Sequence, residues 1–206
     1  MSIVTRALRS LGVAAAAVSL SACISLLPED KPAKLYRFDG APAAEPSPAA
    51  ERFGVVRAGG GFVQAAANDR ILTVNGSQAS YIAESRWVSP AQVLFGEALT
   101  RAFDANTGGA RLLGRGELGK ADYSLRVEVT RFEAVYDQGA KAAPNVVVAV
   151  RTTLVNSDRT LAGTKQIETQ VRARDNRVGA IVGAFDEAVG QTLGELVAWT
   201  NARGAG

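Results

Sequence analysis

Histidine is absent from this 206-residue chain, and cysteine occurs only once. Without histidine, the chain can form neither a Ser-His-Asp or Cys-His catalytic arrangement nor a His-ligated metal site. The single cysteine, Cys23, excludes an internal disulfide and a CxxC site. We therefore expect a protein that is not an enzyme, with no catalytic residues, no metal ion and no bound cofactor.

A strong charge imbalance is also lacking. The chain has 23 Lys and Arg residues against 20 Asp and Glu residues. Arg6 and Arg9 lie in an N-terminal segment that we expect to be removed, and the remaining 21 bases leave a net charge of +1. A net charge this small does not indicate a nucleic-acid-binding protein, so nucleic acid is not an expected partner. The hydrophobic share of 47% and the charged share of 21% are those of a folded globular chain.

No apolar run approaches the ~20 residues that a membrane-spanning helix needs. The longest run, residues 10–20, is about half that length and follows two arginines, as in a secretory signal. It ends in Leu20-Ser21-Ala22-Cys23, which resembles the lipobox of bacterial lipoproteins. That resemblance implies that residues 1–22 are a signal peptide and that Cys23 carries a covalent lipid. The alternative is a buried apolar cysteine close to a signal anchor.

The segment after the lipobox determines where the protein is held. Residues 23–33 contain two prolines and a short charged stretch, which indicates a tether between Cys23 and the folded body. The ten residues after Cys23 reach at most ~33 Å. Ser25 stands where enterobacterial lipoproteins that stay in the inner membrane carry Asp. We therefore expect a lipid-anchored, periplasm-facing protein of the cell envelope, in the outer rather than the inner membrane.

The rest of the chain, residues 34–203, is predicted to form one domain. Alternating and β-rich segments predict strands over residues 35–38, 52–58, 70–74, 78–83, 111–113, 122–136, 145–156 and 161–173. Apolar residues at helical spacing predict helices over residues 90–106 and 176–201. This order predicts an α+β fold, with one mixed or antiparallel sheet and two amphipathic helices on one face.

Local signals define two of the expected connections. Asn75-Gly76 between two β-rich runs predicts a tight hairpin, because both residues tolerate positive φ. Ser89, Pro90 and Gln92 stand at the N-cap, N1 and N3 positions of the first helix and predict a capping box.

The second predicted helix contains four glycines, although glycine disfavours the helical conformation. Gly179, Gly183, Gly190 and Gly194 lie within the second predicted helix, where each costs ~1 kcal/mol relative to alanine. Close packing of this helix onto the sheet accounts for them, and the alternative is a face for homo-oligomer formation. The G-x-G-x-x-G sequence of residues 114–119 precedes a strand, not a helix, so a turn accounts for it better than a nucleotide site.

Tyr81, Arg86 and Trp87 are the candidate partner surface. They lie between the predicted hairpin and the first helix, and aromatic residues and arginine are enriched at protein interfaces. For Trp87, packing between helix and sheet is the alternative.

With these residues identified, the chain resembles the ABC-type transport auxiliary lipoprotein family, which includes the PqiC-type lipoproteins. The resemblance covers about residues 34–200. The segments that carry it are Leu35-Tyr36-Arg37-Phe38, Asp69-Arg70-Ile71, Tyr81 with Arg86-Trp87 and Pro90, Arg131-Phe132-Glu133, and Ala184-Phe185-Asp186 with Leu196 and Trp199. Two departures from the family pattern are Val88-Ser89 and the triple glycine Gly59-Gly60-Gly61.

The resemblance implies a membrane-anchored, non-catalytic accessory of an MCE-type ABC transporter, of the Mla or Pqi kind, which moves phospholipid between membranes. Its partners would be an MCE-domain protein and the ABC permease and ATPase. The alternative is a structural envelope lipoprotein that binds a non-transport assembly, such as a secretion or cell-wall machine.

Overall fold

The computed structural model describes residues 32–40, 52–114, 116–117 and 119–204. Cys23, Ser25 and the expected signal peptide lie outside these residues. Residues Ala33–Gly206 form one compact unit. Its elements in chain order are β1 (Lys34–Tyr36), β2 (Phe53–Arg57), the 3-10 turn η2 (Gln64–Ala66), β3 (Arg70–Asn75), β4 (Gln78–Trp87), α2 (Ala91–Asp104), β5 (Ala110–Leu113), β6 (Tyr123–Val135), β7 (Asn145–Asn156), β8 (Leu161–Arg172) and α3 (Val178–Gly204).

All eight strands belong to one mixed sheet, which confirms the predicted α+β class. The long strands β6, β7 and β8 form an antiparallel meander, with Val150 opposite both Val129 and Ile167. The residues of β6 and β7 that face the helices are buried and, apart from Thr152, apolar, and a register shift between Val129 and Arg131 interrupts their alternation along β6. The predicted hairpin is also present, since β3 and β4 pair antiparallel, but its turn lies one residue later than predicted. Asn75 pairs with Gln78 as the last residue of β3, so the turn residues are Gly76 and Ser77, and only Gly76, with φ +57°, has the positive φ expected of both Asn75 and Gly76.

One edge of β6 is shared by two parallel strands. β2 pairs with its first residues and β3 with its last. Phe62, in the segment between them, bridges to Val129 in the middle of β6. At the β2 end, the Asp122 carboxylate accepts the N–H of Gly54 at 2.9 Å and lies 3.0 Å from Lys120 Nζ. The backbone hydrogen bond, followed by the lysine, lowers the pKa of Asp122.

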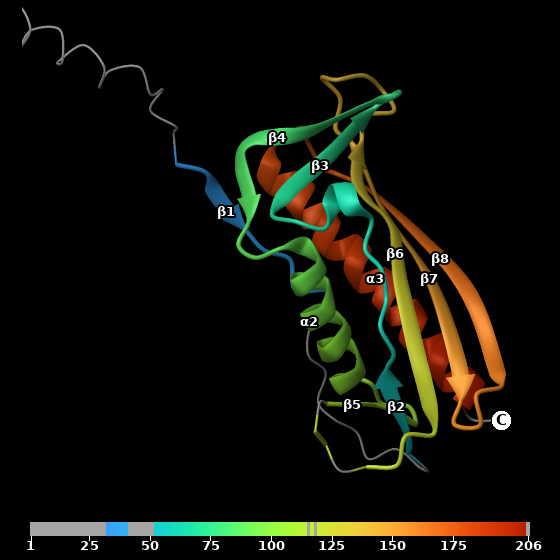
Figure 1. Ribbon diagram of the computed structural model, residues 1–206. Coiled ribbons are helices and arrows are strands. Elements are labelled where there is room, and N and C mark those ends of the chain that lie inside the picture. The colour runs from blue at the N-terminus through green and yellow to red at the C-terminus, as the bar shows by residue number, and fades with distance from the viewer. Residues whose placement is uncertain (1–31, 41–51, 115, 118, 205–206) are drawn as a thin grey trace, which may run out of the picture. The chain divides into compact units, whose positions relative to one another are not determined.

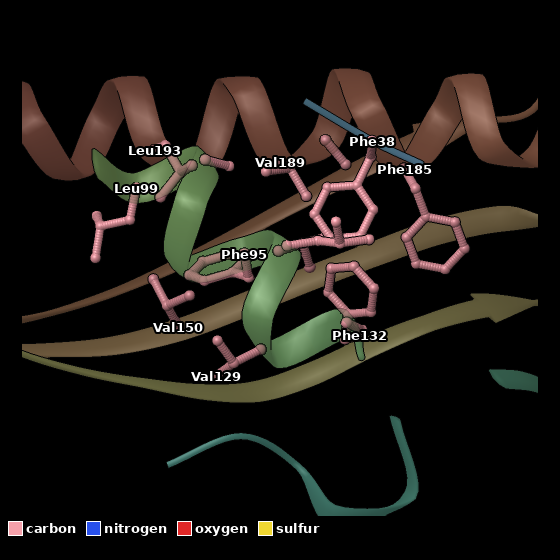
Figure 2. Close-up of a cluster of buried hydrophobic side chains, with 14 of the residues drawn as sticks. Phe38, Phe95, Leu99, Val129, Phe132, Val150, Phe185, Val189 and Leu193 are labelled. Carbon is pink, nitrogen blue, oxygen red and sulfur yellow. The ribbon is translucent and has the colours of Figure 1, made fainter. Parts of the chain in front are cut away.

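The two helices cover one face of the sheet and contact each other. α3 runs along the concave face of β7 and β8, and α2 lies beside it (Figure 1). Their apolar faces meet the inward residues of the sheet in one core (Figure 2). Phe95 and Leu99 enter this core from α2, and Phe185, Val189 and Leu193 enter it from α3.

The predicted capping box at the start of α2 is wrong. The helix begins at Ala91 with Pro90 as its N-cap, and no side chain caps it. The N–H groups of Ala91 and Gln92 instead donate to the carbonyl oxygens of Asn68 and Ala67, at 2.9 and 3.2 Å. Because the tertiary fold brings these carbonyls to the helix end, the free N–H groups need no serine hydroxyl.

Close packing does not explain three of the glycines of α3. A Cβ built on Gly179, Gly183 or Gly194 would meet no atom within 4 Å, so these residues face open space and not the sheet.

We expect Gly183→Ala to stabilise the isolated protein by ~1 kcal/mol, because alanine favours the helix and displaces nothing here. Thermal unfolding of the purified protein measures the gain, and size-exclusion chromatography measures its oligomeric state. A smaller oligomer that unfolds at a lower temperature would contradict this expectation and would indicate a self-association face that requires glycine.

Candidate functional site

Four aromatic side chains from distant parts of the chain meet in one cluster. Phe38 follows β1, Trp87 ends β4, Phe132 lies in β6 and Phe185 in α3. The ring centroid of Phe132 lies 4.8 Å from that of Phe185 and 5.4 Å from that of Phe38, and the Trp87 centroid lies 5.1 Å from Phe38 and 5.3 Å from Phe185. Figure 2 shows the three phenylalanines converging between α3 and the sheet. The cluster therefore joins the start of the folded body to its centre.

Polar contacts hold the same segment against the helices. Asp186 on α3 accepts the N–H groups of Asp39 and Gly40 at 2.7 and 2.9 Å. Arg101 on α2 donates to the carbonyl oxygen of Asp39 at 2.8 and 3.2 Å. Gly40 has φ +73°, and a Cβ there would lie 3.3 Å from Ala98 Cβ, so the chain passes closely between the two helices. The residues after β1 are thus fixed to both α2 and α3.

A groove of about 640 Å³ lies on the surface beside β1. Its apolar lining includes Leu35 of β1, Tyr81 of β4 and Val88, and these side chains are 63%, 40% and 51% exposed. Among the described residues only two other large hydrophobic side chains, Val93 and Leu161, are comparably exposed. Three of the five exposed large hydrophobic side chains of the described residues therefore lie at this one groove.

Charged and aromatic contacts keep the rim of the groove in place. Tyr81 donates its hydroxyl hydrogen to the carbonyl oxygen of Ala65 at 3.0 Å, and the Arg70 guanidinium lies 4.9 Å from the Tyr81 ring centroid. Arg86 donates to Asp69 at 2.9 Å, and both side chains stay partly exposed. An apolar surface bordered by a paired arginine and carboxylate can bind a protein segment. It contains no nucleophile with an adjacent base.

The three residues of the predicted surface divide between two roles. Tyr81 lines the groove, and Arg86 lies next to it through its hydrogen bond to Asp69, which is a lining residue. Trp87 is only 2% exposed and packs in the aromatic cluster, so only its edge reaches the groove wall. Leu35 and Val88 were not predicted as site residues. For Leu35 a signal existed: alternation along β1 places Leu35 on the face opposite Tyr36 and Phe38, which pack toward the core.

Neither a metal-binding cluster nor a membrane-spanning helix occurs in the described part of the chain. Within residues 32–40, 52–114, 116–117 and 119–204, no group of three or more Asp, Glu, His or Cys residues could hold a metal ion. Within the same ranges, no helix combines the length and the hydrophobicity needed to cross a membrane.

Comparisons with known proteins identify the family. The chain is similar to the crystal structure of protein XCC0632 from Xanthomonas campestris, with a TM-score of 0.70 at 21% identity over 84% of this chain and 97% of that one. A second crystal structure, of an uncharacterized protein, has a TM-score of 0.65 at 15% identity over 82% and 99% of the two chains. These two likenesses show the fold.

No curated protein matches the chain. The model of the family described as "ABC-type transport auxiliary lipoprotein component" matches residues 36–197. The chain therefore belongs to the family of auxiliary lipoprotein components of ABC-type transport systems, which are proteins of the cell envelope.

Proposed function

We propose that this protein is a non-catalytic adaptor of an MCE-type ABC transporter that moves phospholipid between the two membranes of the envelope. A lipid on Cys23 holds it at the periplasmic face of the outer membrane. The groove lined by Leu35, Tyr81 and Val88 docks the MCE-domain component, and the permease and ATPase are separate chains. The observation that carries the docking role is the concentration of exposed apolar side chains in this groove.

The position of β1 links the anchor to the groove. Lys34 begins β1 only eleven residues after Cys23, and Leu35 of this strand lines the groove. β1 pairs with β4, with Leu35 opposite Arg86, and the aromatic cluster holds the residues that follow. A partner that binds the groove would therefore be tethered to the lipid anchor through a short stretch of sequence. An adaptor needs such a tether and needs no chemical step.

The alternative is a structural lipoprotein of a non-transport envelope assembly. Both functions use a lipid anchor and a docking surface, so the partner recovered from native membranes decides between them. A mild-detergent pull-down of the acylated protein, with mass spectrometry of the co-purified proteins, makes that test. Recovery of an MCE protein with permease or ATPase supports the proposal, whereas secretion or cell-wall components without MCE partners would refute it.

Leu35→Ser is expected to reduce partner recovery about tenfold or more in this pull-down. Burying one leucine side chain contributes ~1.5–3 kcal/mol, and each 1.4 kcal/mol is a tenfold change in affinity. The matched control is Leu161→Ser, because Leu161 is equally exposed at 63% but lies on β8, away from the groove. It should leave recovery unchanged. Equal losses in the two variants would show that the groove is not the docking surface.

A further inference from the structure

A second hollow, a slot between α2 and β6, lies beside the triple glycine. Its volume is about 260 Å³. Its apolar walls are formed by Phe62, Val93 and Phe95 on one side and by Val127 and Val129 of β6 on the other. Phe95, Val127 and Val129 are buried, while Val93 is 44% exposed at the slot. The slot therefore leads from the surface to the apolar core beside α2.

Two of the three glycines, Gly60 and Gly61, lie in the wall of the slot. The carbonyl oxygen of Gly61 accepts the N–H of Val129 at 2.9 Å, so this segment lies directly along β6. A Cβ on Gly60 would lie 2.0 Å from the carbonyl oxygen of Val127, which leaves room only for glycine. Gly60 and Gly61 therefore contribute only backbone to the wall of the slot.

A positive charge lines the slot. Arg57, at the end of β2, is exposed, and within the described ranges its guanidinium has no hydrogen-bond or ion-pair partner. It lies against α2 at Gly96, where a built Cβ would be 2.9 Å from Arg57 Nη1. Gly96 therefore provides the space in which the guanidinium rests.

We propose that this slot binds a single-chain anionic amphiphile, with the alkyl chain between α2 and β6 and the acidic headgroup on Arg57. An apolar cavity of about 150 Å³ holds benzene, so 260 Å³ accommodates part of one alkyl chain but not the two chains of a phospholipid. The guanidinium matches a carboxylate or a phosphate in charge and geometry. This site is separate from the docking groove, and the inference does not depend on the identity of the transporter.

Photo-crosslinking of the full mature lipoprotein in phosphatidylcholine vesicles tests the proposal. The probes are dodecanoate and lysophosphatidylglycerol, each with a diazirine near the methyl end, and a dodecyltrimethylammonium counterpart of the same length. With the anionic probes, cross-links should map to the peptides that contain Phe62, Val93 and Phe95. If the natural ligand is a fatty acid, dodecanoate should give the higher cross-linking yield. If it is a lysophospholipid, lysophosphatidylglycerol should give the higher yield.

Four variants separate charge, shape and fold. Arg57→Gln should lower the cross-linking yield of the anionic probes about tenfold, because it removes a charge-assisted hydrogen bond. Arg57→Lys keeps the positive charge and should retain most of that yield. Val93→Phe should block the slot, and its exposed position makes the fold tolerant of the larger ring. Gly96→Ala should lower the yield while raising Tm, because the methyl group displaces the guanidinium and alanine favours the helix.

The controls lie outside the slot. Arg126→Gln removes another exposed arginine, and Leu161→Phe enlarges an exposed aliphatic side chain that lines neither hollow, and neither should change the yield. An equal yield with the cationic probe, or cross-links that persist in Val93→Phe, would overturn the proposal. Because no transporter component is present, neither result bears on the adaptor function.

Discussion

Replacing Phe132 with alanine is expected to destabilise the folded body by ~3–5 kcal/mol, the typical cost of removing a buried aromatic side chain. Phe132 is 1% exposed, and its ring contacts those of Phe38, Phe62, Trp87 and Phe185. The change leaves a cavity where β1, β4, β6 and α3 meet, so the surroundings cannot collapse to fill it. Single domains have ~5–15 kcal/mol of stability in total, so a large share would be lost.

Thermal and urea unfolding of the purified protein measure this loss. For a domain of this size each kcal/mol lowers Tm by ~2–4 °C, so a decrease of roughly 6–20 °C is expected. Phe132→Leu is the conservative variant: it keeps most of the apolar volume and should cost about 1–2 kcal/mol. If Phe132→Ala and Phe132→Leu both cost only about 1–2 kcal/mol of stability, the aromatic cluster would not be as central to the fold as its ring contacts indicate.

Cys23→Ser is expected to abolish lipidation, the largest functional effect of any single change in this chain. A serine hydroxyl cannot form the thioether that carries the lipid, and the hydrophobic anchoring energy, ~0.8 kcal/mol for each buried methylene, is lost with it. Intact-mass measurement should find unprocessed precursor or a species without acyl mass. The variant should then fail to restore function in a deletion strain.

Loss of folding must be separated from loss of the anchor in that experiment. Cys23 precedes the compact unit Ala33–Gly206, so circular dichroism and Tm of the folded body should match those of the wild-type protein. Full function of an unlipidated, soluble periplasmic form would contradict the tether on which the proposed adaptor depends.

Periodicity along the chain was sufficient to predict the elements themselves. The strands at residues 122–136, 145–156 and 161–173 correspond to β6, β7 and β8, and both helices lie where apolar spacing placed them. The hairpin between β3 and β4 was also predictable, because Asn-Gly marks a tight turn, although the turn residues are Gly76 and Ser77 and not Asn75 and Gly76. The order of short motifs indicated the family, and the family model confirms it. All of these features depend on neighbouring residues or on a fixed spacing along the chain, so they can be identified from the sequence alone.

Helix ends and helix glycines were harder to interpret. Ser89 has the right chemistry for an N-cap, but the carbonyl oxygens of Ala67 and Asn68 occupy that role. Gly183 has the spacing of a packed helix interface, yet it faces open space. In both cases a sequence pattern has several structural outcomes, and the neighbour that decides between them comes from a distant part of the chain.

The sequence by itself determined the secondary structure, the α+β class, the family and the expected lipid anchor of this protein. Only the tertiary structure decided that β2 and β3 share one edge of β6, that Phe38, Trp87, Phe132 and Phe185 form one cluster, and that Leu35 and Val88 stand beside Tyr81. The physical reason is that burial and exposure depend on which segments return to the same place. Trp87 and Tyr81 are both aromatic residues of β4, and only their packed neighbours place one in the core and leave the other at the surface.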